Sequence, residues 1–408
     1  MTVRSRILVV GMYYAPEPTG IAPYTTSMCR HFVEQGHDVT VVTGVPHYPQ
    51  WKVSPGHRRP FSTEMLDGVK VMRRRHYVPT VQSAITRAFY EASWLAPALP
   101  QMLRHRPDVV LAVTPPLAAL PLARTAATIS RSPWGVVLQD FMGKGAAQAG
   151  TPGGARVADL VDRIERSHLS AADRVAVIGP GFRDAVVEMG VKPGRIDVVP
   201  NWTHVKPSAM TRDEARTMLG WSLDEFLVIH TGNMGYKQGL ENVVAAAREA
   251  DDRQAPITFL LVGDGNQRES LQQEAVGIER IRFIPPVDAD EYPLVLAAAD
   301  VLLVNERPGM VEMSLPSKVT SYLGAGRPVL AAIPATGGTA RMLDETKAAE
   351  VIPAGNPAAL VDAAVRLAGD DSARANLAER GTMHAESEFA ESAALARYDA
   401  FLAKLLDR

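Results

Sequence analysis

Short apolar segments alternate with longer amphipathic ones along the whole chain. An apolar run of strand length predicts a strand buried in a parallel sheet, and apolar residues spaced three and four apart predict a helix. In the first half we expect strands at 6–11, 38–43, 68–73, 108–113, 134–139, 173–178 and 196–199, and helices at 22–35, 84–105, 117–130, 156–170 and 180–189. This alternation is typical of an α/β fold with helices on both faces of a parallel sheet.

The second half repeats the rhythm after a polar segment, 203–212, which we interpret as a linker. We expect strands at 226–231, 257–262, 281–284, 300–304, 328–333 and 349–352, and helices at 239–250, 267–275, 290–298, 315–325, 357–368, 372–382 and near 390–406. A length of 408 residues also suits two domains better than one. The pattern therefore predicts two doubly wound α/β domains.

The segment Gly232-Asn-Met-Gly-Tyr-Lys-Gln-Gly239 joins an expected strand to an expected helix. A glycine-rich turn at that place exposes backbone N–H groups beside the positive end of a helix, which favours an anion. Lys237 adds a full positive charge, so a phosphate-bearing ligand is expected. The alternative is a tight turn with a solvated lysine.

The first half opens in the same way. An apolar strand ending at Gly11 is followed by the loop 12–21, which contains Gly20, and by a helix that ends before Gly36, a typical residue after a helix C-terminus. Two halves of this kind could bind a diphosphate between helix N-termini.

Composition narrows the class of protein. The single cysteine, Cys29, excludes a disulfide within the chain and a cysteine-rich metal site. No apolar run reaches the roughly 18 residues that a membrane-spanning helix needs, and the first residues lack the apolar core of a secretory signal. We therefore expect a cytoplasmic enzyme.

Charge divides unevenly between the halves. Residues 1–200 contain 23 Lys and Arg against 15 Asp and Glu, a net of +8, and the remainder contains 20 against 30, a net of −10. The apolar segment 85–103, preceded by Arg73, Arg74 and Arg75, is a candidate for peripheral contact with the inner membrane face. A buried helix kinked at Pro97 is the alternative.

Several motifs occur in an order that resembles the GT-B glycosyltransferases of family four, and within it the colanic-acid and N-acetylfucosaminyl transferase-like group. They lie at 14–21, 36–43, 46–52, 139–140, 232–239, 262–265, 315–318 and 325–328. Single pieces such as Gly-Asp-Gly are weak signals, but the ordered set spans nearly the whole chain.

The resemblance implies two Rossmann-like domains facing across a cleft: an acceptor-binding domain at 1–203, a nucleotide-sugar-binding domain at 204–385, and a helix at 386–408 that crosses back. It further implies a retaining transferase that uses a nucleotide-diphosphate sugar and needs no metal or other cofactor. In our interpretation the donor is UDP-linked and carries a hexose or N-acetylhexosamine type of sugar. The acceptor is a hydroxyl of a lipid-linked polysaccharide intermediate or of a small secondary-metabolite scaffold. The residues agree on the metal, since no Asp-x-Asp and no clustered ligand set is present. Nucleic acid is not an expected partner.

The chain departs from the family pattern at two places. Asn233 stands where an arginine is common, and Ser321 stands where a second glutamate usually grips the ribose hydroxyls. Met313 holds the place of the first glutamate, with Glu312 beside it. We expect Lys318 to supply the charge of the missing arginine.

Donor binding is assigned to both halves. Lys237 is expected to stabilise the leaving diphosphate, and Glu312 is expected to bind the sugar hydroxyls and favour oxocarbenium character. The remaining expected donor contacts are Gly20, Gly232, Asn233, Gly263, Ile284, Pro285, Met313, Ser314, Leu315, Lys318 and Ser321.

Acceptor binding is assigned to the first half, at the carboxyl ends of its strands. Asp140 would orient the acceptor or act as a base, with a helix N-cap as the alternative role. The other expected acceptor contacts are Thr19, His47, Tyr48 and Lys52.

Two other functions remain open. A GT-B UDP-N-acetylglucosamine 2-epimerase or hydrolase would need carboxylates around the sugar, whose pattern is not clear here. A non-catalytic nucleotide-sugar-binding protein is conceivable because of Asn233 and Ser321, although Lys237, Lys318 and Glu312 argue against it. A dinucleotide oxidoreductase is disfavoured, since no Gly-x-Gly-x-x-Gly follows the first strand.

Overall fold

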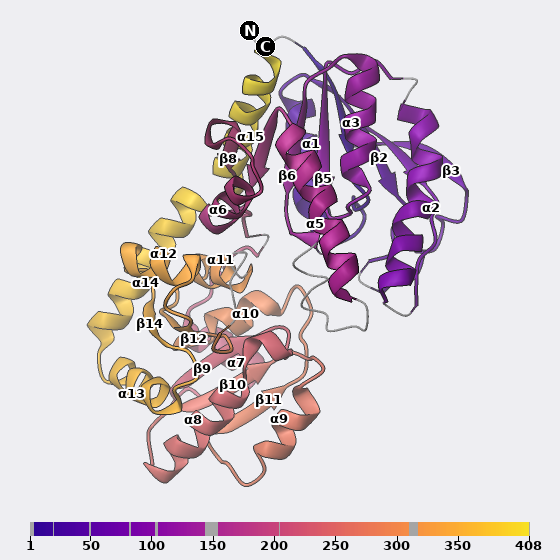
Figure 1. Ribbon diagram of the computed structural model, residues 1–408. Coiled ribbons are helices and arrows are strands. Elements are labelled where there is room, and N and C mark those ends of the chain that lie inside the picture. Colours follow the sequence, from indigo (N-terminus) through magenta and orange to yellow (C-terminus); the bar gives the residue numbers. More distant parts are fainter. Residues whose placement is uncertain are drawn as a thin grey trace. The chain divides into compact units, whose positions relative to one another are not determined.

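The computed structural model describes residues 4–18, 20–48, 50–80, 83–102, 105–142, 154–203, 205–309 and 317–407 (Figure 1). Their contacts divide the chain into two compact units, Met1–Pro200 with Ala394–Arg408, and Asn201–Ala393. The units thus change after 200 and after 393, whereas the expected domain limits lie after 203 and after 385. Each unit is described by itself.

The first unit is built on an eight-stranded sheet of order β3-β4-β2-β1-β5-β6-β7-β8. Its strands are β1 Arg6–Val10, β2 Asp38–Gly44, β3 Phe61–Leu66, β4 Val69–Arg74, β5 Val109–Thr114, β6 Trp134–Leu138, β7 Arg174–Val177 and β8 Ile196–Val198. All neighbours pair in parallel except β3 and β4. Every strand expected in this half is present, as the apolar runs predicted.

Strand β3 was not expected, and it makes the sheet mixed rather than wholly parallel. It joins β4 through Asp67 and Gly68, which have φ values of 48° and 77°. Positive φ at both turn residues is typical of a two-residue hairpin, for which Asp-Gly is a strong sequence signal. Because β3 lies at the sheet edge, Phe61 and Met65 remain exposed and no apolar run marks the strand.

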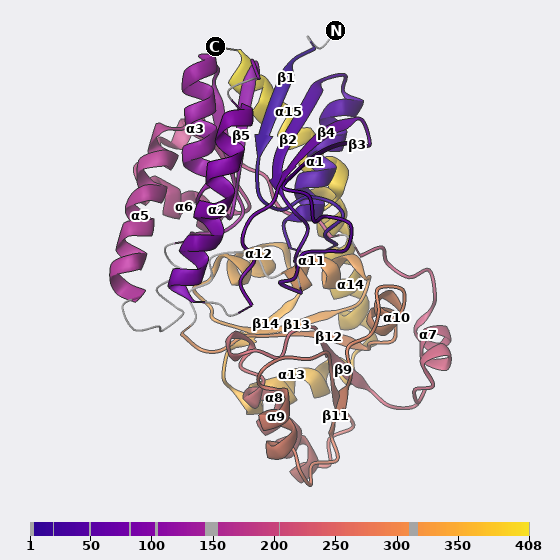
Figure 2. The ribbon, with the colours of Figure 1, turned by 90° about the vertical axis from the view of Figure 1, so that its right-hand side faces the viewer.

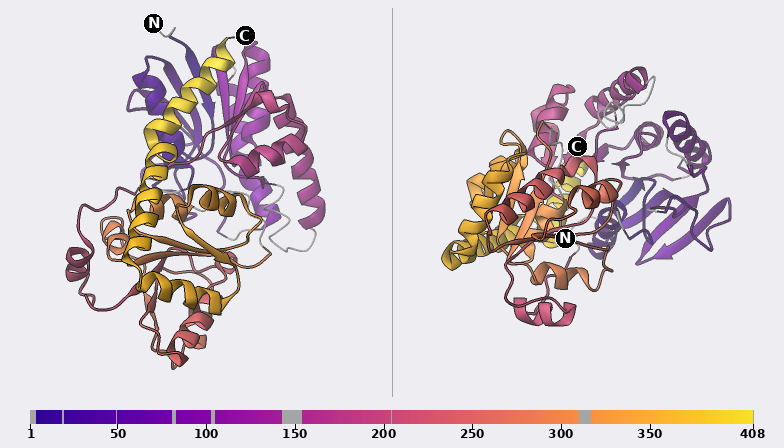
Figure 3. Two further views of the ribbon diagram at one scale, coloured as in Figure 1. Left: turned by 90° about the vertical axis from the view of Figure 1, so that its left-hand side faces the viewer. Right: turned by 90° about the horizontal axis from the view of Figure 1, so that it is seen from below.

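Helices cover both faces of this sheet: α1 Ala22–Glu34, α2 Ala84–Met102, α3 Ala119–Ser130, α5 Gly154–Ala171, α6 Pro180–Glu188 and α15 Glu391–Leu406, the last mostly within this unit (Figure 2). In α15, Phe401 and Leu405 pack over Gly135 of β6, where an added Cβ would lie 2.8 Å from each. Lys404 pairs with Asp197 at 2.6 Å. Figure 3 shows α15 along this sheet.

The two interpretations of segment 85–103 are separated by burial. Tyr90, Trp94, Ala98 and Met102 are all at most 1% exposed and recur every four residues, so α2 packs one face into the core. Phe89 is exposed on another side. The structure therefore favours the buried-helix interpretation for most of the segment.

The expected basic patch at 73–75 is largely wrong. Arg73 is 1% exposed and pairs with Glu64 at 2.6 Å, and Arg74 is 2% exposed with its guanidinium over the Phe61 ring. Only Arg75 of these three is exposed. Glu64 and Phe61 of β3 contact the other two, which the sequence did not reveal because β3 itself was not expected.

The second unit holds a parallel sheet of order β11-β10-β9-β12-β13-β14. The strands are β9 Leu227–Thr231, β10 Thr258–Val262, β11 Ile281–Ile284, β12 Val301–Asn305, β13 Val329–Ile333 and β14 Glu350–Pro353. The helices are α7 Arg212–Leu219, α8 Glu241–Asp252, α9 Arg268–Glu274, α10 Tyr292–Ala297, α11 Ser317–Gly324, α12 Gly338–Thr346, α13 Pro357–Ala368 and α14 Asp371–Glu388.

Separate apolar cores lie on the two faces of this sheet. Helices α8, α9 and α13 pack on one face, and α10, α11, α12 and the end of α14 pack on the other. The expected elements are all present, but α7 and α12 were missed. The supposed linker ends in Thr211, whose side chain caps α7 together with Glu214. This Thr-x-x-Glu capping box is visible in the sequence.

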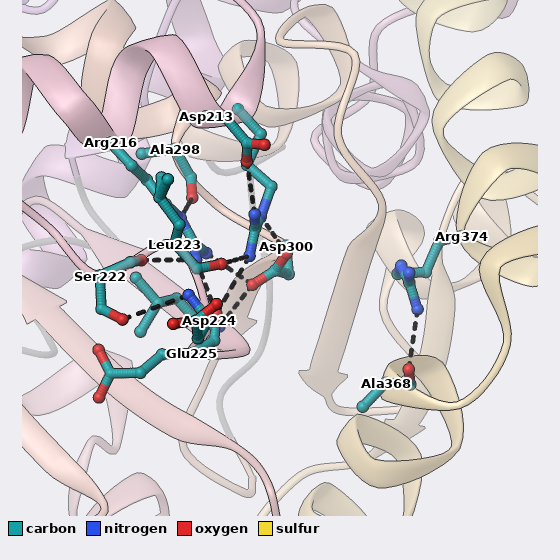
Figure 4. A network of polar contacts seen from close by, with 12 residues as sticks. Asp213, Arg216, Ser222, Leu223, Asp224, Glu225, Ala298, Asp300, Ala368 and Arg374 are labelled. Carbon is teal, nitrogen blue, oxygen red and sulfur yellow. Dashed lines mark hydrogen bonds and ion pairs between the residues drawn. The ribbon is translucent and has the colours of Figure 1, made fainter.

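A largely buried ion-pair network connects α7 to this sheet (Figure 4). Asp300 accepts hydrogen bonds from Arg212 Nε and Arg216 Nη2, both at 2.6 Å, and from the Leu227 backbone N–H at 2.7 Å. Arg216 is fully buried and also donates to the carbonyls of Ala298 and Glu225. The network joins α7 to the starts of β9 and β12.

Candidate functional site

The strand order of the second unit reverses direction between β9 and β12. In doubly wound sheets a ligand binds at the carboxyl ends of the strands beside such a switch point. Thr231 ends β9 and Asn305 ends β12, so the segments that follow them define the candidate site. Charged groups of the described residues there include Lys237, Glu306 and Lys318.

Two turns meet backbone to backbone beside β9. Gly232 follows β9 and Gly263 follows β10, and a Cβ added to Gly263 would lie 2.0 Å from the Gly232 carbonyl oxygen. Gly263 also has φ +140°, which favours glycine. The Met234 N–H donates to the Asp264 carbonyl at 2.8 Å. Gly263 is thus required for the shape of the turn that carries Gly232 and Asn233.

Asn305 holds the rest of this turn in place. Its Nδ2 donates to the carbonyls of Gln238 at 2.7 Å and Gly239 at 3.0 Å, and its Oδ1 accepts from Asn242 Nδ2 at 2.9 Å. Asn305 is 1% exposed, so these partners satisfy a buried amide. These hydrogen bonds of Asn305 fix the short 3₁₀ turn Tyr236–Gln238, which carries Lys237.

Lys237 lies on that 3₁₀ turn rather than on the first turn of α8, which begins at Glu241. Its side chain is exposed, and its carbonyl accepts from the Arg307 N–H at 3.0 Å. Asn233 is also exposed. Both side chains can therefore reach a ligand at the carboxyl end of the sheet.

Lys318 reaches the same turn from α11. The Lys318 Nζ lies 3.0 Å from Nε2 of His230. A Cβ added to Gly232 would lie 4.0 Å from the same Nζ atom. Burial lowers the pKa of Lys318 to about 8, while the nearby Glu306 opposes that shift. The structure thus brings together Gly232 and Lys318, which are 86 positions apart in the sequence.

Glu306 directly follows β12 and interacts electrostatically with Lys318 and Lys237. Burial raises the pKa of its carboxyl group, while Lys318 and then Lys237 lower it. Among these three groups, the two lysines outnumber the one carboxylate when all are ionised. Such a site suits an anion with more than one oxygen, such as a diphosphate.

The first unit gathers polar residues at the carboxyl ends of β1 and β2. Glu17 Oε1 accepts from the backbone N–H groups of His47 at 2.8 Å and Tyr48 at 2.9 Å. Gly20 has φ +69°, and a Cβ added there would lie 3.2 Å from the Tyr48 ring. Burial raises the pKa of Glu17. The buried carboxyl group of Glu17 therefore connects the loop that follows β1 to the loop that follows β2.

His47 does not face solvent, which corrects the expectation that its ring meets the acceptor directly. The residue is 1% exposed, and its ring hydrogen-bonds through Nδ1 to the Val45 carbonyl and through Nε2 to the Tyr90 hydroxyl, both at 2.8 Å. Tyr90 donates in turn to the Tyr13 hydroxyl at 2.9 Å. In contrast, Lys52 is exposed. Asp140 is also exposed and accepts from the Phe141 N–H at 2.8 Å.

Comparison with known proteins identifies the family. The family model "Glycosyl transferase 4-like domain" matches residues 19–202, and the model "Glycosyl transferases group 1" matches residues 225–370. Over 337 residues the chain is 33% identical to the colanic acid biosynthesis glycosyl transferase WcaI of Escherichia coli strain K12, covering 79% of this chain and 81% of the relative.

The chain belongs to the GT-B glycosyltransferases of family four.

Solved structures agree with the fold of this glycosyltransferase. A sucrose-phosphate synthase from Thermosynechococcus elongatus aligns with a TM-score of 0.75 and 17% identity, covering 99% of this chain and 100% of the other. HepE of Anabaena, solved in complex with UDP-glucose, aligns with a TM-score of 0.68 and 17% identity over 99% and 100% of the two chains. At these identities the likeness concerns the fold, which is GT-B as expected.

Several expected site residues of the glycosyltransferase have other partners or are not described. Of the expected donor contacts, the Ile284 carbonyl accepts from the Gly263 N–H at 3.0 Å and from Arg268 at 3.1 Å, whereas Pro285 is exposed. The Ser321 hydroxyl lies 3.3 Å from both the Ser317 carbonyl and Thr203 Oγ1. Those outside the described residues are Thr19, Glu312, Met313, Ser314 and Leu315.

His230, Asn305 and Glu306 of the glycosyltransferase were not among the expected site residues. All three are polar or charged residues inside, or directly after, otherwise apolar strands, and that is the signal that could have found them. In the described ranges, no three His, Cys, Asp or Glu side chains are grouped as metal ligands, and no helix is long and apolar enough to cross a membrane.

Proposed function

We propose that this glycosyltransferase moves a hexosyl or N-acetylhexosaminyl group from a nucleotide-diphosphate sugar to an acceptor hydroxyl, with retention of configuration and with UDP as the nucleotide. The convergence of Lys237, Lys318 and the Gly232 turn at the switch point of the second unit carries this proposal. The UDP-glucose complex of HepE supports the choice of nucleotide.

In this proposal the lysines act on the leaving group. As the glycosidic bond to phosphate breaks, negative charge develops on the diphosphate, and fixed cations and N–H groups stabilise it without reorganisation. Lys237 and Lys318 supply the cations. We further propose that Glu312 binds the sugar hydroxyls and that Asp140 orients the acceptor hydroxyl.

The acceptor proposal rests on the first unit and on the likeness to WcaI. A lipid-linked intermediate of a surface polysaccharide fits the role in colanic acid biosynthesis for which that relative is named. Tyr48 and Lys52, on the loop after β2, are the proposed contacts, with Gly20 beside them. Peripheral membrane contact remains part of this proposal, with Arg75 in place of the buried Arg73 and Arg74.

Thermal-shift measurements with a panel of nucleotide-sugars test the donor. We expect a UDP-sugar to raise the melting temperature most, since a ligand at about 100 times its Kd adds roughly 2.7 kcal/mol to the free energy of unfolding. The best donor is then incubated with candidate acceptors, and the anomeric configuration of the product is read by NMR. Hydrolysis to a free epimerised sugar instead of transfer would contradict the proposal, as would an inverted product.

Transfer should persist without a divalent metal. Lys237 and Lys318 provide positive charge at the proposed diphosphate site, so a bridging cation is not required there. We expect EDTA-treated enzyme to keep its rate to within a few-fold. Complete loss of transfer that magnesium or manganese restores would show this prediction to be wrong.

A further inference from the structure

His230 is a fully buried histidine at the candidate site that the proposed chemistry does not use. It lies one residue before the end of β9, and its Nδ1 is 3.1 Å from the Leu303 carbonyl oxygen on β12. A carbonyl only accepts, so Nδ1 carries the proton of this bond. Nε2 then has a free lone pair, and it lies 3.0 Å from the ammonium of Lys318, which only donates. The contact with the Lys318 ammonium thus fits the neutral tautomer that is protonated at Nδ1.

We propose that His230 is a positioning residue, which holds the Lys318 ammonium over the Gly232 turn by accepting its hydrogen bond and so presents that charge to the donor diphosphate. This inference rests on the proposed function, because it assigns Lys318 to the diphosphate. It adds a residue that acts through Lys318 and need not touch the ligand.

The hydrogen bond to His230 restricts the position of the Lys318 ammonium. A lysine side chain has many rotamers, and fixing it costs conformational entropy that a bond to a rigid ring can offset. The imidazole is rigid because β9 and β12 clamp it, with Nδ1 tied to a backbone carbonyl of the neighbouring strand. The position of the Lys318 ammonium is thus fixed by a residue of the sheet as well as by α11, the helix that carries the lysine.

Burial and the neighbouring Lys318 charge keep the imidazole neutral. Burial first, and the Lys318 charge second, hold the pKa of His230 well below its usual value, against backbone hydrogen bonds with Leu303 and Asn233 that raise it. The titratable groups that act on the pair are Glu306 after β12, which faces Lys318, and Lys237 on the 3₁₀ turn, which acts on Glu306. His230 therefore remains an acceptor through the neutral range.

The protonation of Lys318 then sets an upper pH limit for donor binding. The pKa of Lys318 is lowered to about 8, so the cation is present below that pH and is lost as the pH rises through it. A hydrogen bond accepted from the ammonium stabilises the charged form, and removing the acceptor lowers the lysine pKa further. The loss of His230 should therefore move the limit to lower pH.

The test compares His230→Phe, which removes the acceptor, with His230→Gln, which can keep an acceptor near Nε2. For each enzyme, kcat/KM for the donor is measured from pH 6 to 9.5. We expect a basic limb near pH 8 in the parent, a limb at lower pH and a loss of about 10- to 100-fold in His230→Phe, and substantial recovery in His230→Gln. A limb at the parent pH in His230→Phe would overturn the proposal.

A second measurement needs no transfer activity. Lys318 reactivity toward acetic anhydride is followed against pH by mass spectrometry, with the exposed Lys192 of the first unit as internal reference. The lysine should become reactive at lower pH in His230→Phe than in the parent, and unchanged titration would overturn the inference. His37→Phe, the same change at a histidine of the first unit, controls for general destabilisation. Parent enzyme inactive with every sugar nucleotide would instead defeat the proposed function.

Discussion

Lys237→Ala should lower kcat by roughly 10²–10³ while the protein remains folded. Lys237 is exposed on the 3₁₀ turn Tyr236–Gln238, at the carboxyl end of the sheet, and in our proposal its charge meets the diphosphate as the bond to the sugar breaks. Loss of one preorganised group of this kind typically costs that factor. Steady-state kinetics with saturating donor and acceptor measure it.

The effect should be specific to this lysine. Lys206 is also exposed in the second unit, and Lys206→Ala should leave kcat within about twofold, because surface substitutions away from special features have small effects. Melting temperatures of both variants should match the parent. A Lys237→Ala enzyme that turns over within a few-fold of the parent would remove Lys237 from the proposed mechanism.

Asp300→Ala should lower the free energy of unfolding of the second unit by about 3–5 kcal/mol. The substitution removes the carboxylate that pairs with Arg216 and Arg212 and leaves the fully buried Arg216 charge without a counter-ion (Figure 4). Breaking a buried pair from one side is strongly destabilising for this reason. It also leaves the Leu227 N–H without its acceptor. Urea unfolding followed by circular dichroism measures the change.

Asp213→Ala is the matched control. Asp213 also pairs with Arg212, at 2.6 Å, but its side chain is 65% exposed, and exposed ion pairs contribute about 0–1 kcal/mol. We expect a change of that size or less. If Asp300→Ala is as mild as Asp213→Ala, then the network is not the anchor of α7 that the structure indicates.

Secondary structure was predictable where burial is strong and local. Each expected strand is present because a strand inside a parallel sheet is apolar on both faces, which a sequence displays directly. The elements that were missed lack this signal. Strand β3 alternates exposed and partly buried residues at a sheet edge, and α7 begins within the polar segment that we interpreted as a linker.

The glycine-rich turn of the candidate site was predictable from the sequence, but the tertiary partners of its buried polar side chains were not. Gly232 and Lys237 lie within one local motif, so spacing alone indicated a phosphate-binding turn. His47 shows the opposite case: its place after a strand suggested a ligand contact, yet the Val45 carbonyl and the Tyr90 hydroxyl occupy its ring nitrogens. Tyr90 comes from α2, and nothing in the sequence places α2 over that loop.

The sequence by itself determined the two α/β halves, the family and the turn that carries Lys237, because all of these depend on patterns within a short stretch or on ordered motifs. Only the tertiary structure decided which polar residues are buried together: His230 with Lys318, Asn305 with the turn 236–239, and Asp300 with Arg216. These partners lie between 66 and 88 positions apart. Strand order and helix packing bring them within hydrogen-bonding distance, and in a buried environment each polar group must find such a partner.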